Sequence, residues 1–67
     1  MDDLENRFSY HPPKDDQAAR YQNIRAGGLW LASMINELCP DSQEKSLAMT
    51  KLREVVMWAN ASIAVNE

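Results

Sequence analysis

The chain has 67 residues, a net charge of −3, one cysteine and one histidine. At this length a hydrophobic core contributes only about 3–5 kcal/mol, so a stable fold usually needs disulfides, a metal or association with other chains. Cys39 has no partner for an internal disulfide, and the lone His11 gives no metal-ligand spacing. We therefore expect a single domain, residues 1–67, that self-associates and holds no metal or cofactor.

The charge and hydropathy of the chain also bear on its partners. Duplex DNA would need a basic face that touches many phosphates, and an acidic chain of this size does not supply one. A small anion needs only one or two local cations. The sequence contains no long apolar run and no basic leader with an apolar core, so we expect neither a membrane protein nor a secreted one. A cytosolic protein is the expectation.

Residues 1–14 are predicted to form an N-terminal arm. The first seven residues are polar and acidic, a composition that predicts poor order unless a partner chain holds them. In segment 8–13, two aromatic residues and the histidine precede paired prolines, which keep a chain extended and exclude a helix. We expect this segment to be a rigid extended arm.

A first helix is predicted over residues 15–39. Asp15 or Asp16 can act as its N-cap, and Pro40 lies just beyond its end. Residues spaced three and four apart mark one side of this helix as a packing seam: Tyr21, Ile24, Gly28, Leu31, Ile35 and Leu38. A seam of this kind predicts another helix packed against it.

A second helix is predicted over residues 41–66. Asp41 is the expected N-cap, with Glu44 completing a capping box. Its seam comprises Ala48, Met49, Leu52, Val55, Val56, Ala59 and Ile63. Because the connection around Pro40 is short, the second helix turns back antiparallel to the first. The predicted fold is all-α: an antiparallel helical hairpin with an extended N-terminal arm.

Large apolar side chains remain outside both seams: Trp30, Met34, Met57 and Trp58. Aromatic residues and methionine are favoured in subunit interfaces. We therefore expect the hairpin to assemble into a homo-oligomeric helical bundle.

The Gly27–Gly28 pair interrupts the first predicted helix, at a cost of about 1–2 kcal/mol relative to two alanines. One interpretation is that Gly28 lies on the seam and allows another helix to approach closely. The other is that the missing side chains open a floor beneath a flat ligand. The sequence leaves both open, with the first favoured.

Catalysis has little support in the sequence. No nucleophile–histidine–carboxylate arrangement, phosphate-binding glycine loop or paired-histidine metal motif is present, so we expect no enzyme. A nucleotide site has more support, because Tyr10 offers a ring on which a base can stack, while Lys14 and Arg25 can meet phosphate oxygens. Lys45 can reach an anion across a subunit boundary. The alternative is that Tyr10 is part of a hydrophobic latch and that the cations are solvated or paired.

Four blocks of sequence resemble a known family. FSYHP at 8–12, RYQNIR at 20–25, PDSQEKSLA at 40–48 and MWANA at 57–61 are similar, in the same order, to phage anti-CBASS proteins. The resemblance covers nearly the whole chain from Phe8 onward. It implies a small helical protein that forms homohexamers and sequesters cyclic oligonucleotides made by bacterial defence cyclases. The effector then lacks its activator, and the nucleotide is not degraded.

The resemblance also implies where ligands bind. Cyclic dinucleotides such as 3',3'-cGAMP would lie between protomers, and cyclic trinucleotides at separate sites. The arm tyrosine would stack on a purine and the basic position of the first helix would meet a phosphate. We expect six ligand-binding residues: Tyr10, His11, Pro12, Lys14, Arg25 and Lys45. Val65 stands where the family often has an arginine, which counts against the trinucleotide site.

Two other functions stay open at this point. Related hairpin proteins act against Thoeris signalling by binding molecules of the cyclic ADP-ribose type, so a sponge for that signal is one alternative. The other is a structural or adaptor helical oligomer that docks a host protein through its Trp and Met surface. In either sponge reading, the protein would act in the cytoplasm of the infected bacterial host.

Overall fold

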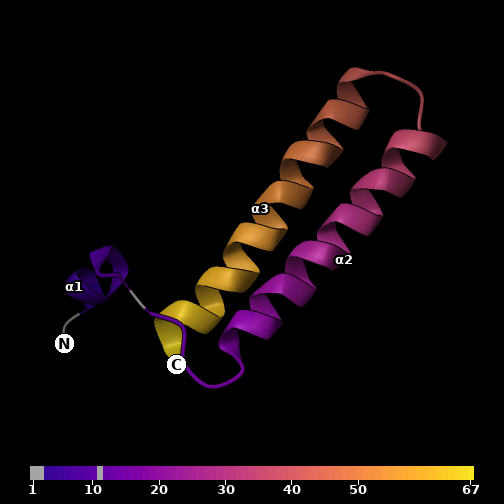
Figure 1. Ribbon diagram of the computed structural model, residues 1–67. Helices are drawn as coiled ribbons and strands as arrows, with labels where there is room; N and C mark the ends of the chain where they lie inside the picture. The colour runs from indigo at the N-terminus through magenta and orange to yellow at the C-terminus, as the bar shows by residue number, and fades with distance from the viewer. Residues whose placement is uncertain (1–2, 11) are drawn as a thin grey trace.

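The computed structural model describes residues 3–10 and 12–67, and these form three helices: α1 (Asp3–Phe8), α2 (Gln17–Leu38) and α3 (Gln43–Asn66). Helices α2 and α3 run side by side in opposite directions, while the short α1 stands apart near the C-terminal end of α3 (Figure 1). The molecule is an elongated single layer of 46 × 24 × 13 Å. The predicted all-α antiparallel hairpin is confirmed.

The start of α3 differs from the prediction by one residue. Ser42, not Asp41, is the N-cap: its backbone is extended and its Oγ accepts a hydrogen bond from the Lys45 amide at 3.0 Å. The Asp41 carboxylate instead pairs with the Lys45 ammonium at 3.0 Å. The predicted capping box of Asp41 and Glu44 is therefore wrong, because the shorter serine side chain already satisfies the amide of the third helical residue.

The start of α2 is also built differently. Asp16 occupies the N-cap position, but its side chain makes no capping hydrogen bond; it accepts from Arg20 Nε at 3.2 Å. Asp15 adopts a φ of 53°, in the left-handed region that aspartate tolerates better than most residues. The chain thus turns from the arm into α2 at Asp15, two residues before the helix begins.

The N-terminal segment contains a helix that the composition did not predict. Leu4, Glu5 and Arg7 are good helix formers, and the Ser9 hydroxyl donates a hydrogen bond to the Glu5 carbonyl oxygen at the end of α1. These local preferences explain why residues 3–8 form a helix where poor order was expected. Phe8, which was predicted to belong to the extended segment, is the last residue of α1, and residues 9, 10 and 12–14 are not helical.

The contact between α2 and α3 uses most of the predicted seam. Gly28 faces α3 without room for a side chain: a Cβ at this position would lie 2.5 Å from Val56 Cγ2, in agreement with the packing interpretation. Four predicted seam residues are exposed, contrary to expectation: Leu31, Leu38, Ala48 and Val55. Three of them precede a half-buried residue, Ala32, Met49 or Val56, so at these positions the helix contact follows the next residue along the chain.

The hairpin encloses no core of its own. Among the described residues no hydrophobic side chain is fully buried, and the one buried residue is Gln17, 4 % exposed. Trp30, Met57 and Trp58 are exposed, as predicted from their positions outside the seams, whereas Met34 is half-buried. Within the described ranges, no helix combines the length and apolar character needed to cross a membrane.

Candidate functional site

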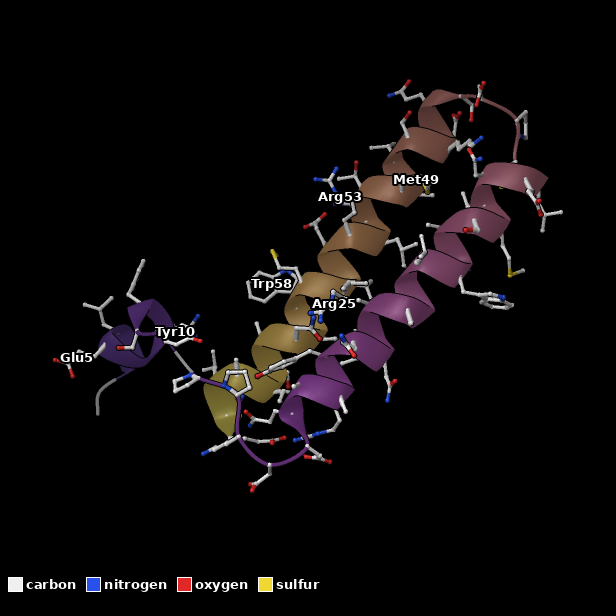
Figure 2. All side chains as sticks on the ribbon, in the orientation of Figure 1. Glu5, Tyr10, Arg25, Met49, Arg53 and Trp58 are labelled. Carbon is white, nitrogen blue, oxygen red and sulfur yellow. The ribbon has the colours of Figure 1, made fainter. Side chains whose placement is uncertain are left out.

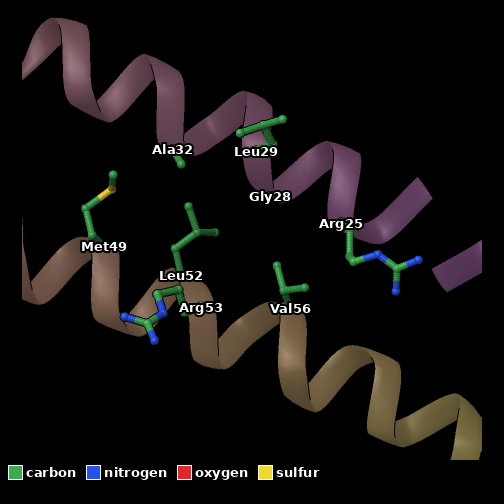
Figure 3. Close-up of a pocket in the computed structure, with 8 residues that line it drawn as sticks. All are labelled: Arg25, Gly28, Leu29, Ala32, Met49, Leu52, Arg53 and Val56. Carbon is green, nitrogen blue, oxygen red and sulfur yellow. The ribbon is translucent and has the colours of Figure 1, made fainter. Parts of the chain in front are cut away.

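A groove of about 340 Å³ lies on one face of the hairpin, across the line where α2 meets α3. Its floor and walls are mostly apolar, and two arginines lie at its rim. The lining residues are Arg25, Gly28, Leu29 and Ala32 from α2, and Met49, Leu52, Arg53 and Val56 from α3. Figure 3 shows Arg25 and Arg53 projecting from opposite helices, with Gly28 and Val56 between them. The groove therefore combines a small-residue floor with two positive charges.

Arg25 and Arg53 differ from the other cations of the hairpin in having no acidic partner among the described residues. Arg20 is held by Asp16 and Glu67, Lys45 by Asp41, and Lys51 by Glu54. The unpaired state of the two groove arginines leaves all their N–H donors available to an external anion.

Two buried polar atoms also lack a partner within the described part of the chain: the Tyr21 hydroxyl oxygen and Asn60 Oδ1. Tyr21 is four residues before Arg25 on α2, and Asn60 is four residues after Val56 on α3, so each lies one helical turn beyond the groove. Buried polar groups are normally hydrogen-bonded, and exceptions need an explanation such as a ligand or a partner chain.

The predicted site residue Tyr10 does not reach this groove within one chain. It follows α1, its side chain is 83 % exposed, and it lies at the end of the hairpin where α3 terminates, apart from Arg53 and Met49 (Figure 2). Tyr10 and Arg25 are thus both accessible but not brought together by a single protomer. His11 lies outside the described residues.

Pro12 and Lys14 belong to a second cavity, of about 330 Å³, between the arm and the end of α3. Here Lys14 Nζ donates to the backbone carbonyl of Glu67, and the Glu67 carboxylate accepts from Arg20 Nη1 at 3.0 Å and from Gln17 Nε2 at 3.2 Å. The hydrogen bonds from Arg20, followed by that from Gln17, lower the pKa of the Glu67 carboxyl from 4.5 to about 2. This cluster ties the start of α2 to the end of α3.

Lys45 lies in the first turn of α3, at the end of the hairpin where α2 and α3 are connected. Its ammonium donates to the Asn36 carbonyl oxygen at 3.1 Å and pairs with Asp41, and its side chain is only 12 % exposed. Within one chain Lys45 therefore closes the hairpin turn.

Arg53, which lines the groove, was not among the predicted site residues, although the sequence carries a signal that it has no helical ion-pair partner. Helical ion pairs form between residues three or four apart, and neither Arg53 nor Arg25 has an acidic residue at either spacing. Arg20, Lys45 and Lys51 each do. Arg53 also directly follows the seam residue Leu52, which places it at the edge of the helix contact.

No cluster of three potential metal-ligating side chains occurs in the described ranges, and the chemistry of the groove is that of an anion site with apolar walls.

Comparison with known proteins gives one result. The family model described as "Acb2/Tad1, hairpin domain" matches residues 1–64, which include both long helices. No curated protein and no solved structure matches the chain. The chain belongs to the Acb2/Tad1 hairpin family of phage anti-defence sponge proteins.

Proposed function

We propose that this protein binds cyclic dinucleotide second messengers, such as 3',3'-cGAMP, and withholds them from the CBASS effector without degrading them. Membership of the sponge family supports a cyclic nucleotide ligand. The observation that carries the proposal is that Arg25, on the exposed rim of an apolar groove, has no acidic partner among the residues that the structure describes. A guanidinium in this state is suited to a phosphodiester, to which it can donate two parallel hydrogen bonds.

The complete site requires a second protomer. Because Tyr10 is exposed on the arm and stands away from the groove of its own chain, its ring is available to stack on a base held by another subunit. A two-fold axis supplies both Tyr10 and Arg25 twice, and a cyclic dinucleotide has two bases and two phosphates related by a near two-fold. We propose that these pockets form within a homohexamer.

No step of this function breaks a bond. Sequestration needs only affinity and enough copies of the protein, and the residues proposed for the site stack, donate hydrogen bonds and supply charge. The site of action proposed is the cytoplasm of the infected bacterium, where the effector would otherwise meet its activator.

Other ligands of the same class are less well supported. The end of α3 carries Val65, an uncharged residue, where a trinucleotide site of the family would often use arginine. We therefore expect weaker binding of cyclic trinucleotides than of cyclic dinucleotides. A Thoeris signal of the cyclic ADP-ribose type has phosphates and an adenine ring, so the same groove could hold it.

An adaptor function is the competing proposal from another class. It is favoured by one observation, the exposure of Trp30, Met57 and Trp58 on the hairpin. In that case the exposed side chains would contact a host protein, and Arg25 and Tyr10 would have no ligand in common.

Calorimetric titration with a panel of cyclic dinucleotides, cyclic trinucleotides and a cyclic ADP-ribose derivative tests the proposal. We expect saturable binding that is tightest for a cyclic dinucleotide, with linear dinucleotides as the matched control and bound more weakly. Tightest binding of the ADP-ribose derivative would move the function to Thoeris signalling. A panel without any binding ligand would overturn the sponge proposal and favour the adaptor.

A further inference from the structure

We propose that Gln17 is a positioning residue for ligand binding: it anchors the arm to the hairpin and thereby sets where Tyr10 is presented to a neighbouring protomer. The inference rests on the proposed function, in which the Tyr10 ring stacks on a base held by another subunit. It gives Gln17 a role that the sequence did not indicate, because glutamine is mostly an exposed residue in folded proteins.

The hydrogen bonds of Gln17 join the arm, the start of α2 and the end of α3. Its Oε1 accepts from the Lys14 backbone amide at 3.2 Å, and its Nε2 donates to Glu67 Oε1 at 3.2 Å. The Gln17 backbone amide in turn donates to the Lys14 carbonyl oxygen at 3.0 Å. Lys14, the last residue of the arm, is therefore held through both its amide and its carbonyl group by one residue of α2.

Burial distinguishes this anchor from the other polar contacts of the cluster. Gln17 is 4 % exposed and is the one buried residue among those described. The Lys14 ammonium and the Arg20–Glu67 pair are exposed, and contacts of that kind are readily replaced by water. Without the Gln17 side chain, the Lys14 amide would lose its acceptor and would regain one from water when the arm moves off the hairpin.

The length of the arm shows what the anchor does for Tyr10. The Tyr10 side chain is 83 % exposed, so packing within its own protomer does not fix it (Figure 2). Tyr10 is four residues from Lys14 and seven from Gln17. At a maximum of about 3.5 Å per residue, a fixed Lys14 confines Tyr10 to within about 14 Å, whereas a fixed Gln17 alone confines it to within about 24 Å.

This difference in reach predicts the size of the effect on binding. The volume open to the Tyr10 ring grows about 5-fold when the anchor is lost, and its effective concentration at a neighbouring subunit falls by the same factor. A ligand that two Tyr10 rings contact should feel the loss twice, which gives about 25-fold.

Gln17→Ala tests the anchor. We expect this variant to bind 3',3'-cGAMP about 5-fold to 25-fold more weakly by calorimetry. Hydrogen exchange of the Lys14 amide should be faster in the same variant, because that amide has lost its acceptor. The matched control is Gln22→Ala, which truncates an exposed glutamine of the same helix. Its affinity and its Lys14 exchange should stay within about 2-fold of the parent.

A double-mutant cycle with Tyr10→Ala separates positioning from a structural role. If Gln17 acts through Tyr10, Gln17→Ala should weaken binding less than about 2-fold once Tyr10 is already replaced. A purely structural defect would cost the same affinity in both backgrounds, because the effects of distant and independent residues add.

Exchange of the two polar groups provides a rescue. Gln17→Glu alone places a carboxylate against that of Glu67, and the repulsion should weaken the anchor. Glu67→Gln added to it supplies an amide that can donate to the new carboxylate, which still accepts from the Lys14 amide. The double variant should recover most of the affinity and of the protection of the Lys14 amide. Helical content and oligomeric state are measured on each variant.

Each failure has a distinct meaning. If Gln17→Ala leaves the Lys14 exchange or the affinity unchanged, or lowers the affinity equally with and without Tyr10, the positioning role is refuted and the proposed function stands. If Gln17→Ala does not assemble, the exchange pair decides: recovery in the double variant supports the role, and no recovery refutes it. If the parent binds no member of the panel, the function and the positioning role both fall.

Discussion

Gly27 and Gly28 are neighbours in the sequence but lie in opposite environments on α2. A Cβ on Gly28 would meet Val56 at 2.5 Å, whereas one on Gly27 would meet nothing within 4 Å. Neither glycine has a positive φ, so the backbone of α2 is open to alanine at both positions. The requirement for glycine at position 28 is therefore one of space between the helices.

Alanine substitutions of the two glycines should have opposite effects on stability. Gly27→Ala should raise the free energy of unfolding by about 1 kcal/mol through helix propensity. Gly28→Ala should lower it, because overpacking against the stiff Val56 side chain costs about 1–3 kcal/mol and exceeds the same propensity gain. Thermal and denaturant unfolding measure both changes, and Val56→Ala in the Gly28→Ala background should restore part of the loss. A destabilised Gly27→Ala would instead place another subunit against that glycine.

Tyr10 and Arg25 are predicted to contribute binding energy of different kinds. Tyr10→Ala should cost about 1–3 kcal/mol for each stacked base, and Arg25→Ala about 1.5–3 kcal/mol for a charge-assisted contact. Arg25→Lys should lose part of the affinity if the guanidinium donates two hydrogen bonds. Calorimetry on assembled variants measures these losses. Parent-like affinity in both alanine variants would leave the arm as a structural latch only.

The sequence predicts individual residues unevenly. Arg25 was identified as a phosphate-binding candidate, and the structure places it at a groove rim; Arg53 could have been identified from the absence of an acidic residue at helical spacing. The relation between Tyr10 and Arg25 could not be predicted, because it depends on how protomers assemble. The contact that Lys45 makes across the hairpin turn could not be predicted either, because it depends on where the fold places the Asn36 carbonyl oxygen.

At the scale of the elements, the cluster around Glu67 joins the end of α3 to the start of α2. Its carboxylate accepts from Arg20 and Gln17, and the same contact raises the pKa of the Arg20 guanidinium. Gln17 is the most buried residue of the described chain, and its own amide oxygen accepts from the Lys14 amide at 3.2 Å. The cluster thereby fixes where the arm leaves the hairpin.

Stability should therefore fall at acid pH through Glu67. The pKa of its carboxyl is about 2 in the folded protein and about 4.5 without its partners, so the contribution is fully present above 4.5 and is lost as the pH falls toward 2. Unfolding followed from pH 7 to pH 2 should show this loss in the parent and a flatter profile in Glu67→Gln. Glu54→Gln, which removes the exposed pair with Lys51, should keep the parent profile. Parallel profiles for parent and Glu67→Gln would contradict the assignment.

The boundaries of the two long helices were predictable within a few residues, but the residue that caps α3 was not. Periodicity predicted helices over 15–39 and 41–66, and the structure has Gln17–Leu38 and Gln43–Asn66. Two neighbouring residues at the start of α3, Asp41 and Ser42, are both good N-caps, so the choice between them is made by the backbone conformation of the turn. Helix α1 was missed because a polar composition predicts poor order even where its residues favour a helix.

At the scale of the whole molecule, one hairpin exposes more surface than a compact protein of its mass. Its accessible surface is 5402 Å² for 7.6 kDa, whereas compact monomers of this mass expose about 4,300 Å². The difference, about 1,100 Å², exceeds the roughly 800 Å² that one partner typically buries in a specific interface. Large apolar side chains are among the exposed ones, including Trp30 and Trp58.

The protein should accordingly be an obligate homo-oligomer, and a hexamer if it assembles as the resemblance to the anti-CBASS proteins implies. Light scattering coupled to size exclusion measures the mass, and dilution should reduce helical content and assembly together, because the isolated hairpin lacks a core. Trp58→Lys should shift the equilibrium toward smaller species if Trp58 lies in an interface. A folded monomer at micromolar concentration would remove the basis for pockets built between subunits.

The central claim is that the protein holds a cyclic dinucleotide without chemically changing it, and recovery of the ligand tests this most directly. 3',3'-cGAMP is incubated with a stoichiometric excess of protein, the free ligand is removed, the complex is heat-denatured, and the released nucleotide is identified by chromatography and mass spectrometry. The account predicts that the bound amount returns as intact cyclic dinucleotide at every incubation time. Linear or hydrolysed product that increases with time and with protein concentration would contradict it and would make the protein an enzyme.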